Sequence, residues 1–168
     1  MELRINKLNR ILELFYEHPA TSYTIRQIAK ETRIPLSTAQ VYLTSLKKDK
    51  LITIENRAAT TLLFKTKKIN FFVEKIVESG LINELIQELN PSCIIFFGSF
   101  RKGDSTAESD IDIFIETPLS KKIDLKRYHK ILKHNLDLFI EKDLHTLQPH
   151  LINNIINGIK LYGSFTIK

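Results

Sequence analysis

The sequence contains a single cysteine, Cys93, and no apolar run long enough to cross a membrane. A lone thiol excludes a disulfide framework and is typical of proteins in a reducing compartment. The longest unbroken apolar run, CIIFF at residues 93–97, is far shorter than the ~20 residues that span a bilayer. The charged N-terminal stretch has no apolar core of the kind that signal peptides carry. We therefore expect a cytoplasmic protein that does not engage a membrane.

Charge is distributed unevenly along the chain. Residues 1–68 contain 13 Lys and Arg against 6 Asp and Glu, whereas residues 69–168 contain 12 against 13. A basic part joined to a near-neutral part indicates that the first part meets a polyanion. Ordinary surface lysine is the alternative explanation of the same excess. We predict two domains, at residues 1–68 and 69–168, with connecting helices at residues 69–90.

Helical periodicity and capping signals predict three short helices in the first domain. The first helix is amphipathic around residues 8–15. The second begins at a capping box formed by Thr24 and Gln27, and the third at another formed by Ser37 and Gln40. The β-branched stretches LITIE and TTLLFKT, joined by NRAA, then predict a β-hairpin wing with Arg57 at its tip.

Three helices followed by a wing resemble the winged helix-turn-helix DNA-binding domains of prokaryotic regulators, over about residues 5–67. Such turns often contain glycine, but Arg33 stands in this one, and we expect it to adopt an ordinary turn. The third helix would fit the major groove, where Gln40 could read adenine and Val41 could contact a thymine methyl. The alternative is a module for protein docking or dimerisation. The predicted DNA-binding residues are Ser37, Thr38, Gln40, Val41, Thr44, Lys47, Lys48, Arg57 and Lys65.

Paired carboxylates mark the second domain. CIIFF predicts a strand buried on both faces, which ends at Gly98-Ser99. In the next predicted strand, ESDIDIFIE, Asp110 and Asp112 share one face, because residues two apart on a strand point the same way. The segment HNLDLFIEKD alternates likewise, so a neighbouring strand would bring Asp137 beside them. Three carboxylates in one patch repel one another unless cations compensate them, and hard cations prefer oxygen ligands.

The stretch GSFRKGDSTAESDID resembles the signature of the DNA polymerase β-like nucleotidyltransferase superfamily, and most closely its minimal nucleotidyltransferase family. The shared pattern is Gly-Ser, a glycine four residues after that serine, Ser-Asp-x-Asp, and an aspartate on a later strand. The chain departs from it at Arg101 and Lys102, where small members usually have alanine and arginine. The resemblance covers about residues 82–163, and the terminal INGIKLYG looks like the closing helix of the family.

The resemblance implies both an activity and a site. Asp110 and Asp112 would hold two Mg²⁺ ions, and Asp137 would complete one metal site and help to activate the attacking hydroxyl. An NTP such as ATP would be attacked in line at its α-phosphorus, with release of pyrophosphate. The predicted nucleotide-binding residues are Gly98, Ser99, Lys102, Gly103 and Ser109.

The prediction is thus an α+β protein, with a winged helix-turn-helix domain followed by a small mixed-sheet nucleotidyltransferase domain. Its acceptor stays open between a protein, an RNA end and a small molecule. Minimal nucleotidyltransferases often act as antitoxins, so the resemblance implies a helical toxin-like partner, and a DNA-binding part would suit autoregulation of transcription.

Two other hypotheses remain for the whole chain. One is a non-enzymatic DNA-binding regulator whose second domain only senses nucleotide or binds a partner. The other is an RNA-modifying enzyme that docks RNA on its winged helix. A homodimer is compatible with the paired half-sites that such regulators read. We interpret all five histidines as surface residues or satisfied polar residues.

Overall fold

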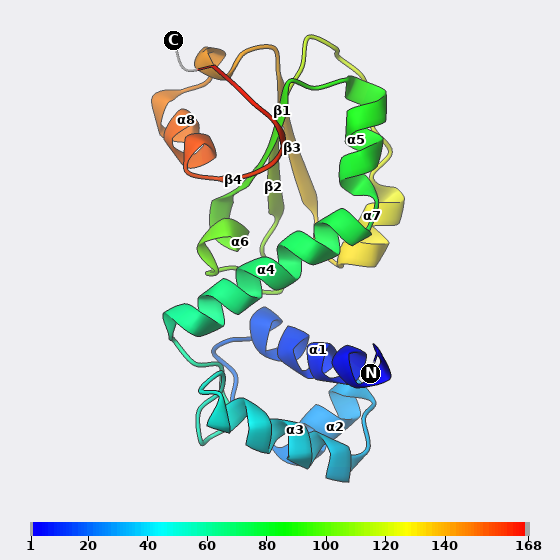
Figure 1. Ribbon diagram of the computed structural model, residues 1–168, viewed down its shortest axis with the longest axis vertical. Helices are drawn as coiled ribbons and strands as arrows, with labels where there is room; N and C mark the ends of the chain where they lie inside the picture. Colours follow the sequence, from blue (N-terminus) through cyan, green and yellow to red (C-terminus); the bar gives the residue numbers. More distant parts are fainter. Residues whose placement is uncertain (1, 167–168) are drawn as a thin grey trace. The chain divides into compact units, whose positions relative to one another are not determined.

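The computed structural model describes residues 2–166, with the side chains of residues 7–166. The chain forms two compact units, Met1–Lys68 and Ile69–Lys168, and their elements are drawn in Figure 1. No helix within the described residues is long and apolar enough to cross a membrane.

The first unit contains α1 (Glu2–Glu17), α2 (Ile25–Thr32) and α3 (Leu36–Lys48), together with the start of a fourth helix. The capping box at the start of α2 is confirmed, because the Thr24 side chain accepts from the backbone N–H of Gln27 and the Gln27 side chain accepts from that of Thr24. The second predicted capping box is wrong. Helix α3 begins at Leu36 behind Pro35, without a side-chain cap, because proline at this point already fixes the entry of the chain into the helix.

The connection between α2 and α3 turns through a left-handed residue. Arg33 has φ 54° and ψ 42°, and its backbone N–H bonds back to the last carbonyls of α2. This is the C-terminal capping conformation that glycine usually supplies. The expectation of an ordinary turn at Arg33 is therefore wrong.

The predicted wing is wrong in its second half. A single antiparallel bridge joins Ile52 and Ala58 around a tight turn. The stretch expected to form the second strand instead opens α4 (Leu62–Glu78). Thr61 Oγ1 accepts a hydrogen bond from the Phe64 N–H at 3.2 Å, so this threonine acts as a helix cap rather than a strand residue.

The sheet of the second unit is mixed, as predicted, and has four strands in the described residues. The strands β1 (Cys93–Phe97), β2 (Ile111–Glu116), β3 (Leu136–Glu141) and β4 (Ile159–Gly163) lie in the order β3-β2-β1-β4. Strand β1 is antiparallel to both β2 and β4, whereas β2 and β3 are parallel. Helices α5 (Leu81–Leu89) and α7 (Lys126–Leu132) lie on one side of the sheet, and α8 (Pro149–Ile156) lies on the other (Figure 1).

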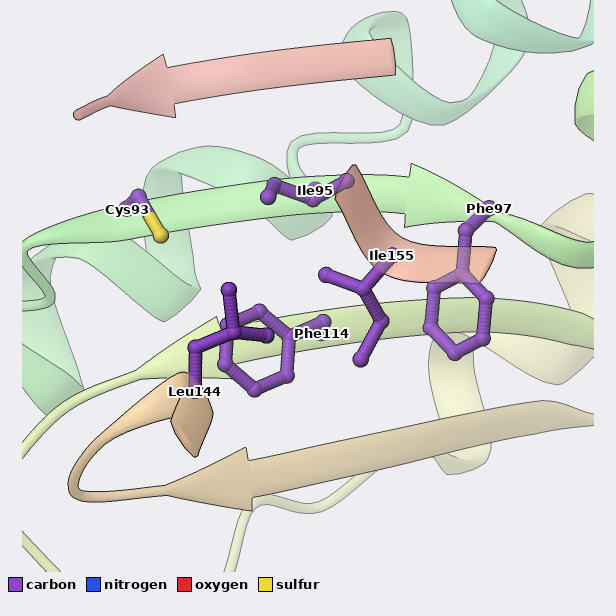
Figure 2. Packing of buried hydrophobic residues seen from close by; sticks show 6 residues of the cluster. All are labelled: Cys93, Ile95, Phe97, Phe114, Leu144 and Ile155. Carbon is purple, nitrogen blue, oxygen red and sulfur yellow. The ribbon is translucent and has the colours of Figure 1, made fainter. Parts of the chain in front are cut away.

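Apolar side chains fill the space between the sheet and α8. Strand β1 is buried along its whole length, as predicted for CIIFF. Figure 2 shows side chains of β1 and β2 packing against side chains of α8 and of the 3₁₀ helix Leu144–Thr146. The members of this cluster are Cys93, Ile95, Phe97, Phe114, Leu144 and Ile155.

The end of the chain differs from the prediction. The stretch INGIKLYG does not form a closing helix, because α8 ends at Ile156 and β4 follows as an edge strand. Gly158 makes this change of direction possible. A Cβ at that position would lie 2.4 Å from Ile95 Cγ2, so only glycine lets the chain pass this close to β1.

Candidate functional site

Two of the predicted carboxylates are direct neighbours across the sheet. The parallel register of β2 and β3 pairs Asp112 with Asp137, and adjacent strands lie ~4.8 Å apart. Asp112 is half-buried, whereas Asp137 is exposed. The structure therefore brings these two carboxylates together at one edge of the second unit.

Asp110 lies one residue before β2 and is also half-buried. Its Oδ1 accepts a hydrogen bond from the side-chain amide of Asn135 at 3.0 Å. The hydroxyl of the preceding Ser109 accepts a bond from the Thr106 N–H at 2.9 Å, so this side chain stabilises the turn that leads into β2. Asp110 is thus held by hydrogen bonds of the residues around the start of β2, and not by pairing within the sheet.

Burial and the neighbouring carboxylates raise the pKa of Asp112. Burial is the largest cause, and the charges of Asp137 and Asp110 add to it, so that the pKa of Asp112 rises to about 6. Each cause disfavours the ionised carboxylate. A bound cation would act in the opposite direction by compensating the negative charge.

The turn after β1 stands directly against Asp112. Gly98 has φ +74°, and a Cβ built on it would lie 1.9 Å from Asp112 Oδ2. Gly98 opens the short helix α6 (Gly98–Lys102), which contains Ser99 in its first turn. Gly103 ends α6 in the left-handed conformation, and Lys102 before it is exposed. The Gly-Ser turn therefore lies beside Asp112, which is paired with Asp137.

The described residues contain no group of three or more His, Cys, Asp or Glu side chains arranged to hold a metal ion. The trio of aspartates is thus not a preformed metal cage. Mg²⁺ is usually held by one or two carboxylates, with substrate phosphates and water completing its shell. The neighbouring carboxylates of Asp112 and Asp137, with a raised pKa at the former, fit that mode of binding.

Helix α3 displays the predicted DNA-reading residues. Ser37, Gln40, Val41 and Thr44 line a shallow surface hollow, and Val41 is 61% exposed. Thr38 is half-buried in the first turn, and Lys47 and Lys48 lie in the last turn.

The two predicted DNA-binding residues outside α3 differ in outcome, because Arg57 lies in the turn where it was expected and Lys65 does not lie in a wing. Arg57 belongs to the tight turn, where its Nε donates to the carbonyl oxygen of Pro19 at 3.4 Å. Lys65 lies in α4 and not in a wing, so its expected position is wrong.

Sequence reasoning missed two residues beside the carboxylates, His134 and Asn135. They lie immediately before β3 and line a polar pocket of about 280 Å³ with Asp110, His129 and Lys133. The histidine is buried and hydrogen-bonded, as a satisfied polar residue should be. The only sequence signal for them was their position directly ahead of the strand that carries Asp137.

A glycine turn held against paired carboxylates in a small mixed sheet is the arrangement expected of nucleotidyltransferases. The nucleotidyltransferase domain family matches residues 78–163. The chain belongs to this family. The matched range lies within the second unit, so the first unit is outside it. Comparison with curated proteins and with solved structures gave no match.

Proposed function

We propose that the second unit transfers a nucleotidyl group from ATP or another NTP to an acceptor hydroxyl. The observation that carries this proposal is the in-register pair of Asp112 and Asp137 with Gly98 against the former. Asp110, Asp112 and Asp137 are the residues that would hold Mg²⁺. When bound, the cation neutralises charge on the triphosphate and on the departing pyrophosphate.

The protein residues have separate roles in this reaction. Gly98 leaves room for the Asp112 carboxylate against the turn, and its lack of a side chain would let the triphosphate approach the backbone closely. Ser99 and the exposed Lys102 supply polar and positive groups on the same helix. The acceptor oxygen forms a bond to the α-phosphorus while the bond from that phosphorus to pyrophosphate breaks. The exposed carboxylate of Asp137 is accessible to the acceptor and takes its proton.

The first unit, in this proposal, binds DNA through α3 and so couples nucleotidyl transfer to transcription. Support comes from its excess of basic residues and from the exposed polar face that surrounds Val41. A helical toxin-like protein is the first acceptor to test, and an RNA end is the second.

Label transfer from α-³²P-ATP with Mg²⁺, in a cell extract as the source of acceptors, tests the activity. The native chain should label a protein or RNA band, and the chemical class of that band identifies the acceptor. Asp112→Asn should abolish labelling, whereas Asp124→Asn, in the loop before α7, should leave it unchanged.

Two other results would change the proposal. Cation-dependent ATP binding without transfer, lost in Asp112→Asn, would favour the non-enzymatic regulator. If the native chain neither binds ATP nor transfers label, the site assignment is overturned.

A further inference from the structure

A buried histidine links α6 to the segment that carries Asp110. His134 is 5% exposed, and its ring centroid lies 4.8 Å from that of Phe100 and 5.8 Å from that of Phe72. Its Nδ1 lies 2.9 Å from the carbonyl oxygen of Ser109. A carbonyl can only accept, so Nδ1 carries the proton and donates it. One imidazole therefore packs against α6 and holds the residue that precedes Asp110.

Asn135, the next residue, forms two hydrogen bonds with the same segment. Its side-chain amide donates to Asp110 Oδ1 at 3.0 Å. Its backbone carbonyl accepts from the Ile111 N–H at 2.9 Å. The pair is anchored in turn to α7, because His129 Nδ1 donates to the carbonyl oxygen of His134 at 3.1 Å. Three consecutive residues, 109 to 111, are thus each held by this dipeptide.

Asp110 needs such support more than Asp112 does. It precedes β2, so the ladder of the sheet does not fix its backbone, and its charge interacts with that of Asp112. Like charges at this range repel, so an unrestrained Asp110 side chain would turn away from the other carboxylates. A carboxylate has two oxygens, so one can accept from Asn135 while the other binds a cation.

We infer that His134 and Asn135 are positioning residues that hold the Asp110 carboxylate toward the cation site. The inference rests on the proposed function, in which Asp110 binds Mg²⁺. Outer hydrogen-bond partners of this kind typically contribute about 10- to 100-fold to metal affinity or activity. Neither residue contacts the reacting atoms in this scheme, and both act through Asp110.

Two variants of the full chain test the inference against a role in packing alone. His134→Phe keeps an aromatic ring against Phe72 and Phe100 but removes the donor to Ser109. Asn135→Ala removes the bond to Asp110 from an exposed position, where the fold is little affected. Asn157→Ala is the matched control, because it deletes an exposed asparagine whose amide donates to the Asn153 carbonyl at 2.8 Å, at the end of α8.

Mn²⁺ binding, followed through the electron paramagnetic resonance of the free ion, gives a readout that does not depend on turnover. Both test variants should bind Mn²⁺ about 10- to 100-fold more weakly than the native chain, while the control binds normally. In label transfer, the same two variants should need more Mg²⁺ for half-maximal rate, and excess Mg²⁺ should restore much of that rate. Nitrogen-15 NMR of the native chain should find the His134 proton on Nδ1.

Native Mn²⁺ affinity in both test variants would overturn the inference and leave the proposed function standing. So would a neutral His134 with its proton only on Nε2, because the bond to Ser109 would then not exist. If the native chain itself neither binds Mn²⁺ nor transfers label, the proposed function fails, and the inference fails with it. If His134→Phe does not fold, Asn135→Ala decides the result alone.

Discussion

Gly98 and Asp112 lie so close together that a Cβ on the glycine would be 1.9 Å from Oδ2 of the aspartate. The glycine also has φ +74°, a conformation that costs other residues energy. Two separate demands therefore select glycine at this position. The first is steric and concerns the carboxylate, whereas the second concerns only the backbone.

Gly98→Ala separates these demands when it is compared with Gly80→Ala. Gly80 has φ +83°, and a Cβ on it would meet nothing within 4 Å, so both variants should lose about 1–2 kcal/mol of stability from backbone strain. Only Gly98→Ala should also displace the Asp112 carboxylate and abolish label transfer. Urea unfolding and the transfer assay measure the two effects. Equal transfer rates in both variants would contradict a role for Gly98 at the site.

Asp112→Asn should stabilise the metal-free protein at neutral pH. The pKa of Asp112 is raised from 3.8 to about 6 in the folded chain, so the unfolded chain ionises first as the pH rises. Stability therefore falls between these two pKa values and stays lower above them. Removing the charge should restore about 1 kcal/mol at pH 7, since solvent screens this half-buried group.

Urea unfolding in EDTA at pH 4 and pH 7 measures this effect. The difference between Asp112→Asn and the native chain should shrink to a small fraction at pH 4. Asp137→Asn should also stabilise at pH 7, because the charge of Asp137 helps to raise the pKa of Asp112. A gain for Asp112→Asn that is as large at pH 4 as at pH 7 would contradict the electrostatic origin.

The placement of the central carboxylates could be predicted from local pattern. Alternation along two strands assigned Asp112 and Asp137 to definite faces, and strand adjacency then brought them together. The hydrogen bond between His134 and the Ser109 carbonyl could not be predicted in this way. It joins residues 25 apart in the chain, and no periodicity within a strand or helix reports a contact between two loops.

The start of α4 at Leu62, where a strand was expected, was missed for a different physical reason. The buried stripe of α4 runs at a spacing of four through Phe64, Lys68, Phe72 and Ile76. A lysine in that stripe interrupts the apolar pattern, so the segment before it resembles a strand. In the fold, Lys68 is 1% exposed and its Nζ donates to the carbonyl oxygen of Tyr16 at 2.7 Å. The bond that makes this burial acceptable is tertiary, and the sequence pattern does not contain it.

Mg²⁺ should raise the unfolding temperature of the native chain, because a ligand that binds only the folded state stabilises it. At a concentration tenfold above its dissociation constant, the gain is about 1.4 kcal/mol. Asp112→Asn and Asp137→Asn should lose most of this gain. Thermal unfolding with MgCl₂, with EDTA, and with KCl at matched ionic strength measures it. An equal shift from KCl would show general screening rather than a cation site.

DNA binding by the first unit should depend steeply on salt, because each phosphate contact releases a counterion. Lys48→Ala in the last turn of α3 should lower the slope of log affinity against log salt by about 0.9.

Gln40→Ala should instead cost about 1–3 kcal/mol on a preferred sequence and little on other sequences, because a base contact discriminates while a phosphate contact does not. The preferred duplex comes from selection on a random pool, and fluorescence anisotropy gives the affinities. Lys122→Ala, an exposed change in the second unit, is the control. If it lowers the slope as much as Lys48→Ala, the charge that binds DNA does not reside on α3.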